Sequence, residues 1–119
     1  MKDKILIYDD DEEILILCKT ILSRYDFKVE TLTACENILE DVQSIQPDLI
    51  LMDLWIPEIG GEKAIEILKQ SESIKQTPIL LFSANADIKE ICKKVKADGY
   101  IEKPFTINVL MEEIRKYTV

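Results

Sequence analysis

Three short apolar runs without polar alternation constrain the fold of this chain more than any other feature of its sequence. They cover residues 5–8, 49–52 and 79–82. Runs of this kind are typical of strands buried on both faces of a parallel sheet, because helices cover both sides of such a sheet. Residues 27–32 alternate between apolar and polar, and residues 99–102 form a short segment. Both segments are therefore predicted to be less buried edge strands.

The segments between these strands have helical periodicity. Apolar residues recur every three or four positions in each of them, as expected for amphipathic helices packed on a sheet. Five strands alternating with five helices predict an α/β fold, a doubly wound parallel sheet, since parallel strands are joined by crossover helices. The predicted buried stripes are Ile14, Leu17, Cys18, Ile21, Leu22 and Tyr25; Ile38, Leu39, Val42 and Ile45; Ala64, Ile65, Ile67 and Leu68; Ile88, Ile91, Cys92 and Val95; and Ile107, Leu110, Met111 and Ile114.

Composition excludes several classes of function. With 15 basic and 23 acidic residues the net charge is −8, so direct binding to nucleic acid or to an anionic membrane is not expected. The sequence contains no histidine, which removes Ser-His-Asp and Cys-His catalysis and any internal phosphohistidine. Histidine chemistry would have to come from a partner.

Cysteine usage and apolar run lengths bear on the compartment. The three cysteines are far apart and form no Cys-x-x-Cys motif, which favours a reducing compartment. No apolar run is long enough for a signal-peptide core or a membrane span. We therefore expect a soluble protein in the cytoplasm.

Polar side chains follow four of the predicted strands at the point where each strand ends. In an open parallel sheet, ligands bind beyond the carboxyl ends of the strands. Carboxylates clustered there repel one another unless a cation lies between them, and Mg²⁺ bound by carboxylates, water and phosphate oxygens is the simplest partner. The residues at these ends are Asp9, Asp10 and Asp11, then Asp53, then Ser83, and last Lys103 with Pro104.

Each of these residues has a simpler interpretation when taken alone. Acids that precede a helix favour its amino terminus, and Asp11 is expected to cap the first helix. Thr106 is expected to cap the last one. A lone polar residue at a strand end is more often a turn residue, and Tyr100 could be a core aromatic residue with a solvated hydroxyl. Their joint placement is what favours a functional site.

Four motifs in this order and spacing carry a resemblance to a known family. They are residues 5–11, residues 49–57 leading to Gly61, the pair Ser83-Ala84, and residues 100–105. Together they resemble the receiver domains of two-component response regulators, the CheY-like family, from near Lys4 to near Tyr117. The resemblance implies a flavodoxin-like (βα)5 receiver fold with strand order 2-1-3-4-5, and a response regulatory domain spanning residues 1–119.

The resemblance also implies a role for each site residue. Asp53 matches the phosphoacceptor, whose carboxylate attacks a phosphoryl group and is itself a metal ligand. Asp10 matches the direct Mg²⁺ ligand, Asp9 the acid that holds the ion through water, and the backbone carbonyl of Trp55 supplies a further oxygen. Mn²⁺ is expected to substitute for Mg²⁺.

Three further residues match the groups around the phosphoryl oxygens. Lys103 pairs with these oxygens and offsets their charge. Ser83 moves to bond the phosphate, and Tyr100 follows inward, so the two form a switch. The peptide bond between Lys103 and Pro104 is expected to be cis.

The loop after Asp53 departs from the usual pattern of the family. Gly60 stands where an acidic residue is usual, and Ile56 where methionine is frequent. Trp55 is bulky for its position, and together with Asn85 it should influence how fast water reaches the acyl phosphate. These departures affect the expected lifetime of the phosphoryl group, not the identity of its acceptor.

The expected function is that of a phosphoacceptor in a phosphorelay, not of an enzyme, although such a domain has intrinsic self-phosphorylation and self-dephosphorylation chemistry. The expected partners are a sensor histidine kinase or a histidine phosphotransfer protein. A downstream protein, or a second copy in a homodimer, would bind the face formed by the fourth helix, fifth strand and fifth helix.

Several alternatives compete with this interpretation. A haloacid-dehalogenase-type phosphatase needs a second aspartate two positions after the first, where Trp55 stands. A flavodoxin-like electron carrier needs a Ser/Thr/Gly-rich phosphate loop where this chain has five acids. A receiver-like scaffold that is never phosphorylated is disfavoured by the complete residue set. Two further alternatives are a single-domain regulator and a receiver excised from a DNA-binding regulator or hybrid kinase. The position of Met1 just before the first strand favours the former, but an excised receiver would also end near Val119.

Overall fold

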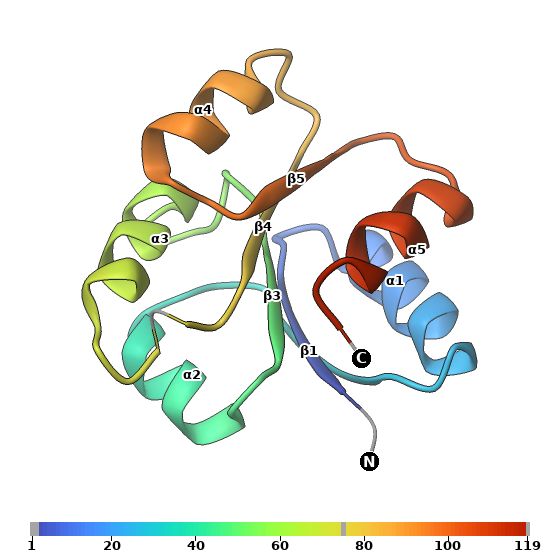
Figure 1. Ribbon diagram of the computed structural model, residues 1–119, viewed down its shortest axis with the longest axis horizontal. Helices are drawn as coiled ribbons and strands as arrows, with labels where there is room; N and C mark the ends of the chain where they lie inside the picture. The colour runs from blue at the N-terminus through green and yellow to red at the C-terminus, as the bar shows by residue number, and fades with distance from the viewer. Residues whose placement is uncertain (1–2, 75, 119) are drawn as a thin grey trace.

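The computed structural model describes residues 3–74 and 76–118. They contain one parallel sheet of five strands in the order β2-β1-β3-β4-β5 (Figure 1). This order confirms the predicted doubly wound topology and places β2 and β5 at the edges. Within these residues the strands are β1 (Lys4–Tyr8), β2 (Lys28–Leu32), β3 (Leu49–Met52), β4 (Ile79–Ser83) and β5 (Gly99–Glu102). The helices between and after them are α1 (Glu12–Arg24), α2 (Ile38–Ile45), α3 (Gly61–Gln70), α4 (Ile88–Val95) and α5 (Ile107–Arg115).

Helices cover both faces of the sheet. As Figure 1 shows, α1 and α5 lie on one side, and α2, α3 and α4 lie on the other. Successive residues of β1 point to opposite faces, so Ile5 and Ile7 pack with α1 and α5 while Leu6 and Tyr8 pack with α2 and α3. All four side chains are fully buried. Burial on both faces is the physical reason for the unbroken apolar runs.

The buried face of α1 differs from the predicted stripe. Leu17 and Tyr25 are 48% and 45% exposed, whereas Leu15, which the stripe omitted, is 5% exposed. Residues 14–17 are all apolar, so periodicity alone does not define which of them faces the sheet. Ile107, in the first turn of α5, was also predicted to be buried and is 48% exposed.

The helix caps and the turn into α5 agree with the predictions. Asp11 accepts a hydrogen bond from the backbone N–H of Glu13 (2.9 Å) and caps α1. Thr106 accepts one from the backbone N–H of Val109 (3.2 Å) and caps α5. The Lys103–Pro104 peptide bond is cis. Among the residues described, no helix has the length and apolar character needed to cross a bilayer.

Candidate functional site

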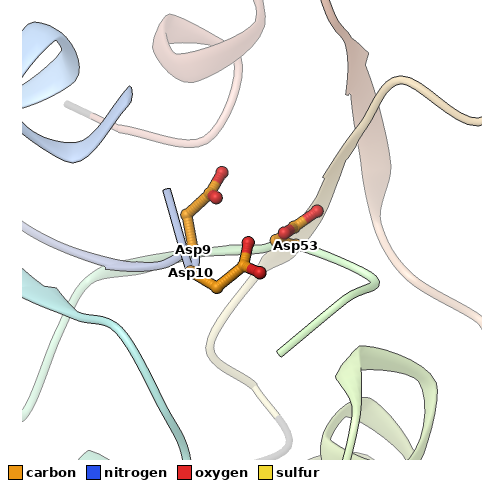
Figure 2. Close-up of side chains that lie close together, drawn as sticks. All are labelled: Asp9, Asp10 and Asp53. Atoms are coloured by element: carbon orange, nitrogen blue, oxygen red, sulfur yellow. The ribbon is translucent and has the colours of Figure 1, made fainter. Parts of the chain in front are cut away.

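Three carboxylates meet at the carboxyl ends of two adjacent strands. Asp9 and Asp10 follow β1 and Asp53 follows β3, which pairs with β1 so that Tyr8 lies opposite Met52. One oxygen from each carboxylate lies within 4.8 Å of the others, and Figure 2 shows the three side chains together. Asp9 and Asp53 are 0% and 4% exposed, whereas Asp10 faces solvent. This donor set, hard oxygens of which one is solvent-facing, suits a divalent cation such as Mg²⁺.

The ammonium group of Lys103 lies beside the two buried carboxylates. Its Nζ atom is 2.5 Å from Asp9 Oδ2 and 3.7 Å from Asp53 Oδ1. It also lies 4.6 Å from the centre of the Phe82 ring, which stacks on Phe105. Buried carboxylates are costly without a compensating cation, so Lys103 stabilises the acid pair. Its position also lets it contact a group bound to Asp53.

A cavity of about 520 Å³ contains these side chains. Ser83, at the end of β4, is 1% exposed, and its Oγ accepts a hydrogen bond from the backbone N–H of Asn85 (3.1 Å). Trp55 is 71% exposed at the rim. The predicted residues brought together here are Asp9, Asp10, Asp53, Trp55, Ser83 and Lys103, and the lining is completed by Asp11, Ala84 and Asn85.

Tyr100 is not among the described residues that line this cavity. It is half-buried in β5 and packs against the core cluster that includes Ile88 and Cys92 of α4. Its neighbour across the sheet is Leu81, two residues before Ser83. Tyr100 therefore lies on the α4 side of the sheet, on the strand next to the one that carries Ser83.

The pKa of Asp53 is raised from its ordinary value of 3.8 to about 6, mainly because burial disfavours the charged form. The nearby charges of Asp9 and Asp10 raise this pKa further. The ammonium of Lys103 and a backbone hydrogen bond from Trp55 act in the opposite direction. A cation bound among the three acids would favour the ionised form that a nucleophilic carboxylate requires.

Sequence reasoning missed two aromatic residues beside the site. Phe82 contacts Lys103, and the hydroxyl of Tyr8 donates a hydrogen bond to Asp41 of α2 (2.9 Å). Both residues belong to apolar runs, whose pattern predicts only buried strand positions. Nothing in the sequence pattern distinguishes them from other strand residues, because their contacts join segments far apart in the chain.

A doubly wound sheet with buried acids and a lysine at its carboxyl edge defines an α/β domain with a polar site at the strand ends. The chain belongs to the response regulator receiver domain family, whose model matches residues 5–115. It is thus a receiver domain of two-component systems, which is a signalling domain.

Three similar proteins illustrate the family. The transcriptional regulatory protein PhoP for alkaline phosphatase synthesis in Bacillus subtilis is 35% identical over 109 residues, which are 89% of this chain and 44% of PhoP. Hybrid signal transduction histidine kinase D of Dictyostelium discoideum is 32% identical over 116 residues, which are 95% of this chain and 7% of the kinase. The chain therefore spans less than half the length of either relative.

The third is a crystal structure, that of the receiver domain of a sensor histidine kinase from Pseudomonas aeruginosa PAO1. It has a TM-score of 0.88 at 22% identity and covers 98% of both chains. That structure is described as having a magnesium ion coordinated in the active site cleft.

Proposed function

We propose that Asp53 accepts a phosphoryl group from a phosphohistidine on a partner protein. The observation that carries this proposal is the buried Asp53 carboxylate, with Lys103 Nζ 3.7 Å from its Oδ1 and two more acids beside it. A carboxylate oxygen of Asp53 attacks phosphorus as the bond from phosphorus to the donor's nitrogen breaks, and that nitrogen takes up a proton. The donor must be external, because this sequence contains no histidine.

Asp9, Asp10 and Asp53 would hold Mg²⁺, with the backbone carbonyl of Trp55 as a further ligand. When bound, the ion would offset charge on the acids and on the phosphoryl oxygens. The solvent-facing position of Asp10 leaves room for water ligands, which Mg²⁺ usually retains. We expect Mn²⁺ to substitute, since it also prefers oxygen ligands.

Lys103 and Ser83 would contact the phosphoryl oxygens. The Lys103 ammonium is already within 3.7 Å of Asp53, so it can bind these oxygens with little movement. The Ser83 hydroxyl lines the same cavity and can donate a hydrogen bond to them. Trp55 and Asn85 line the solvent side, where they would limit the approach of water and slow self-dephosphorylation.

The first test uses the unmodified protein and a small acyl phosphate as donor. With Mg²⁺ present, we expect the protein to gain one phosphoryl group by intact-mass measurement, with the label on the peptide that contains Asp53. Chelating the metal should suppress the gain, since Lys103 alone then offsets the negative charge of the acids and of the incoming phosphoryl oxygens. A protein that gains no phosphoryl group, from either an acyl phosphate or a phosphorylated histidine kinase domain, would contradict the proposal.

The output surface is proposed to be the face formed by α4, β5 and α5, which would bind a downstream protein or a second copy of the chain. A groove of about 640 Å³ lies on the β5 and α5 part of this face, and Tyr100, Glu113 and Tyr117 are among its lining residues. Tyr117 donates a hydrogen bond to the backbone carbonyl of Asp98 (2.8 Å) and joins the end of α5 to the start of β5. Movement of Ser83 toward a phosphate would open space for Tyr100 and alter this face.

Hydrogen exchange tests this route. Phosphorylation is expected to change amide exchange between Asp87 and Tyr117, while residues of α2 at similar depth change less. An identical exchange pattern with and without the phosphoryl group would exclude the α4-β5-α5 face as the responsive surface.

The remaining features of the proposal follow from composition and family. We infer that residues 1–119 act as one response regulatory domain in the cytoplasm. Its net charge of −8 disfavours direct contact with nucleic acid. The assembled acids and lysine also disfavour a scaffold role without phosphorylation.

A further inference from the structure

Tyr8, the residue immediately before the acidic pair, carries a buried hydroxyl group that the proposed phosphoryl transfer does not use. Its side chain is 0% exposed and lies in the core between the sheet and α2. Its hydroxyl donates a hydrogen bond to Asp41 Oδ2 at 2.9 Å, and Asp41 is half-buried on α2. We propose that Tyr8 and Asp41 are positioning residues that set the separation of the metal-binding carboxylates, an inference that rests on the proposed function.

The pairing of these two side chains fixes the end of β1 against α2. Phenylalanine would fill the same apolar space without burying a hydroxyl, and a buried hydroxyl costs free energy unless it is hydrogen-bonded. Asp41 supplies a charged acceptor, which makes a stronger hydrogen bond than a neutral one. The ring of Tyr8 is therefore held at both ends, by the sheet through its backbone and by α2 through its hydroxyl.

The backbone of Tyr8 connects this anchor to the site. Its carbonyl accepts a hydrogen bond from the backbone N–H of Asp53 at 2.9 Å. The next residue, Asp9, donates its backbone N–H to the carbonyl of Leu32 at 3.1 Å. A shift of Tyr8 would thus move the acids of β1 relative to the acceptor on β3. One oxygen from each of the three carboxylates now lies within 4.8 Å of the others. A change in that separation would alter how well they hold one cation between them.

A second contact joins α2 to the other half of the site. The backbone N–H of Cys35, in the loop before α2, donates to the carbonyl of Pro57 (3.4 Å), and Cys35 pairs with Glu58 in a parallel bridge. Pro57 and Glu58 lie in the loop that follows Asp53. The segment formed by Cys35 and α2 is thus bonded to the end of β1 through Asp41 and to the loop after Asp53 through Cys35, and it supports both sides of the site.

The test measures the Mg²⁺ dissociation constant by calorimetry in wild type, Tyr8→Phe, Asp41→Ala and the double variant. Removal of a group that bonds a metal ligand directly typically weakens affinity about 10- to 100-fold. The hydrogen bond between Tyr8 and Asp41 is one residue further from the ion than such a group. Each single variant should therefore raise the Kd by roughly 3- to 10-fold. The double variant should raise it no further than the worse single one, because both changes remove the same hydrogen bond.

Two matched variants separate positioning from general loss of stability. Ser71→Ala removes a hydroxyl hydrogen bond of 3.3 Å to Ser73 in the loop after α3, outside both the acidic cavity and the proposed output surface, and should leave the Kd unchanged. Ile65→Val removes one buried methylene from the same core cluster and should lower stability without altering the Kd. Exchange of the Asp53 amide, measured without metal, should be faster in Tyr8→Phe and Asp41→Ala than in these two controls.

The outcomes distinguish this inference from the proposed function. A wild-type protein that binds no Mg²⁺ would contradict the proposed metal site itself. A wild-type protein that binds Mg²⁺ with the same Kd as Tyr8→Phe and Asp41→Ala would overturn the positioning role alone. If Tyr8→Phe does not fold, Asp41→Ala decides the question, since it changes only a half-buried helix position.

Discussion

Replacing Asp53 by alanine is expected to reduce phosphoryl labelling of this protein to background. The Asp53 carboxylate is buried, and its Oδ1 lies 3.7 Å from the Lys103 ammonium. At that distance it is not held in a short ion pair, so it remains available to attack phosphorus. Asp9 is held by the same ammonium at 2.5 Å, and Asp10 is exposed to solvent. Neither is placed to replace the nucleophile. Intact-mass measurement after incubation with an acyl phosphate and Mg²⁺ provides the comparison.

Asp48→Asn is the matched control for this experiment. Asp48 is an exposed aspartate before β3, and it accepts the backbone N–H of Lys4 at 2.7 Å, a role that the asparagine oxygen retains. This variant should be labelled at the wild-type rate. Labelling of Asp53→Ala to the wild-type extent, or a label mapped to Asp9 or Asp10, would refute the assignment of the acceptor.

Much of this fold could be predicted because a strand that is buried on both faces consists of consecutive apolar residues. The runs at residues 5–8, 49–52 and 79–82 form the three central strands, and the mixed segment at 27–32 contains the edge strand β2. The face of α1 could not be predicted in the same way. Four consecutive apolar residues, 14–17, permit more than one stripe, and only packing against the sheet selects Leu15 over Leu17.

The candidate site also contains residues that the strand pattern predicts and contacts that it does not. Asp53, Ser83 and Lys103 could be located because the carboxyl ends of parallel strands meet at one edge of the sheet. The contacts of Lys103 with Phe82 and of Tyr8 with Asp41 depend on how side chains pack between elements. Tyr8 and Asp41 are 33 positions apart, and neither residue type signals the other. Such supporting contacts follow from tertiary structure alone.

Without divalent cations, the free energy of unfolding is expected to fall as the pH rises from about 4 to about 6, through the Asp53 contribution. The folded protein holds the pKa of Asp53 at about 6, above its ordinary 3.8, mainly because the carboxyl is buried. The folded state therefore binds this proton more tightly than the unfolded state does. The resulting stability is complete below the unfolded pKa and is lost as the pH passes the folded pKa. At about 1.4 kcal/mol per pKa unit, the loss approaches 3 kcal/mol.

The isosteric variant Asp53→Asn isolates this contribution, because asparagine does not titrate. In metal-free buffer it should be as stable as wild type near pH 4 and more stable by up to about 3 kcal/mol at pH 7, measured by denaturant unfolding. Asp48→Asn should keep the wild-type pH dependence. If the difference in stability between wild type and Asp53→Asn is the same at both pH values, burial does not raise the pKa of Asp53.

Mg²⁺ should reverse the destabilisation, since a cation among the three acids favours their ionised forms. At ten times its Kd, the ion should add about 1.4 kcal/mol to the free energy of unfolding of wild type, raising the Tm by several degrees. Asp10→Asn should lose most of this gain. It should keep most of the metal-free pH dependence, because burial, the main cause of the raised Asp53 pKa, is unchanged and only the smaller contribution of the Asp10 charge is removed. A gain that is equal in wild type and Asp10→Asn at matched ionic strength would mean that the ion acts elsewhere on this acidic surface. The buried Asp53 charge would then be left for Lys103 alone to compensate.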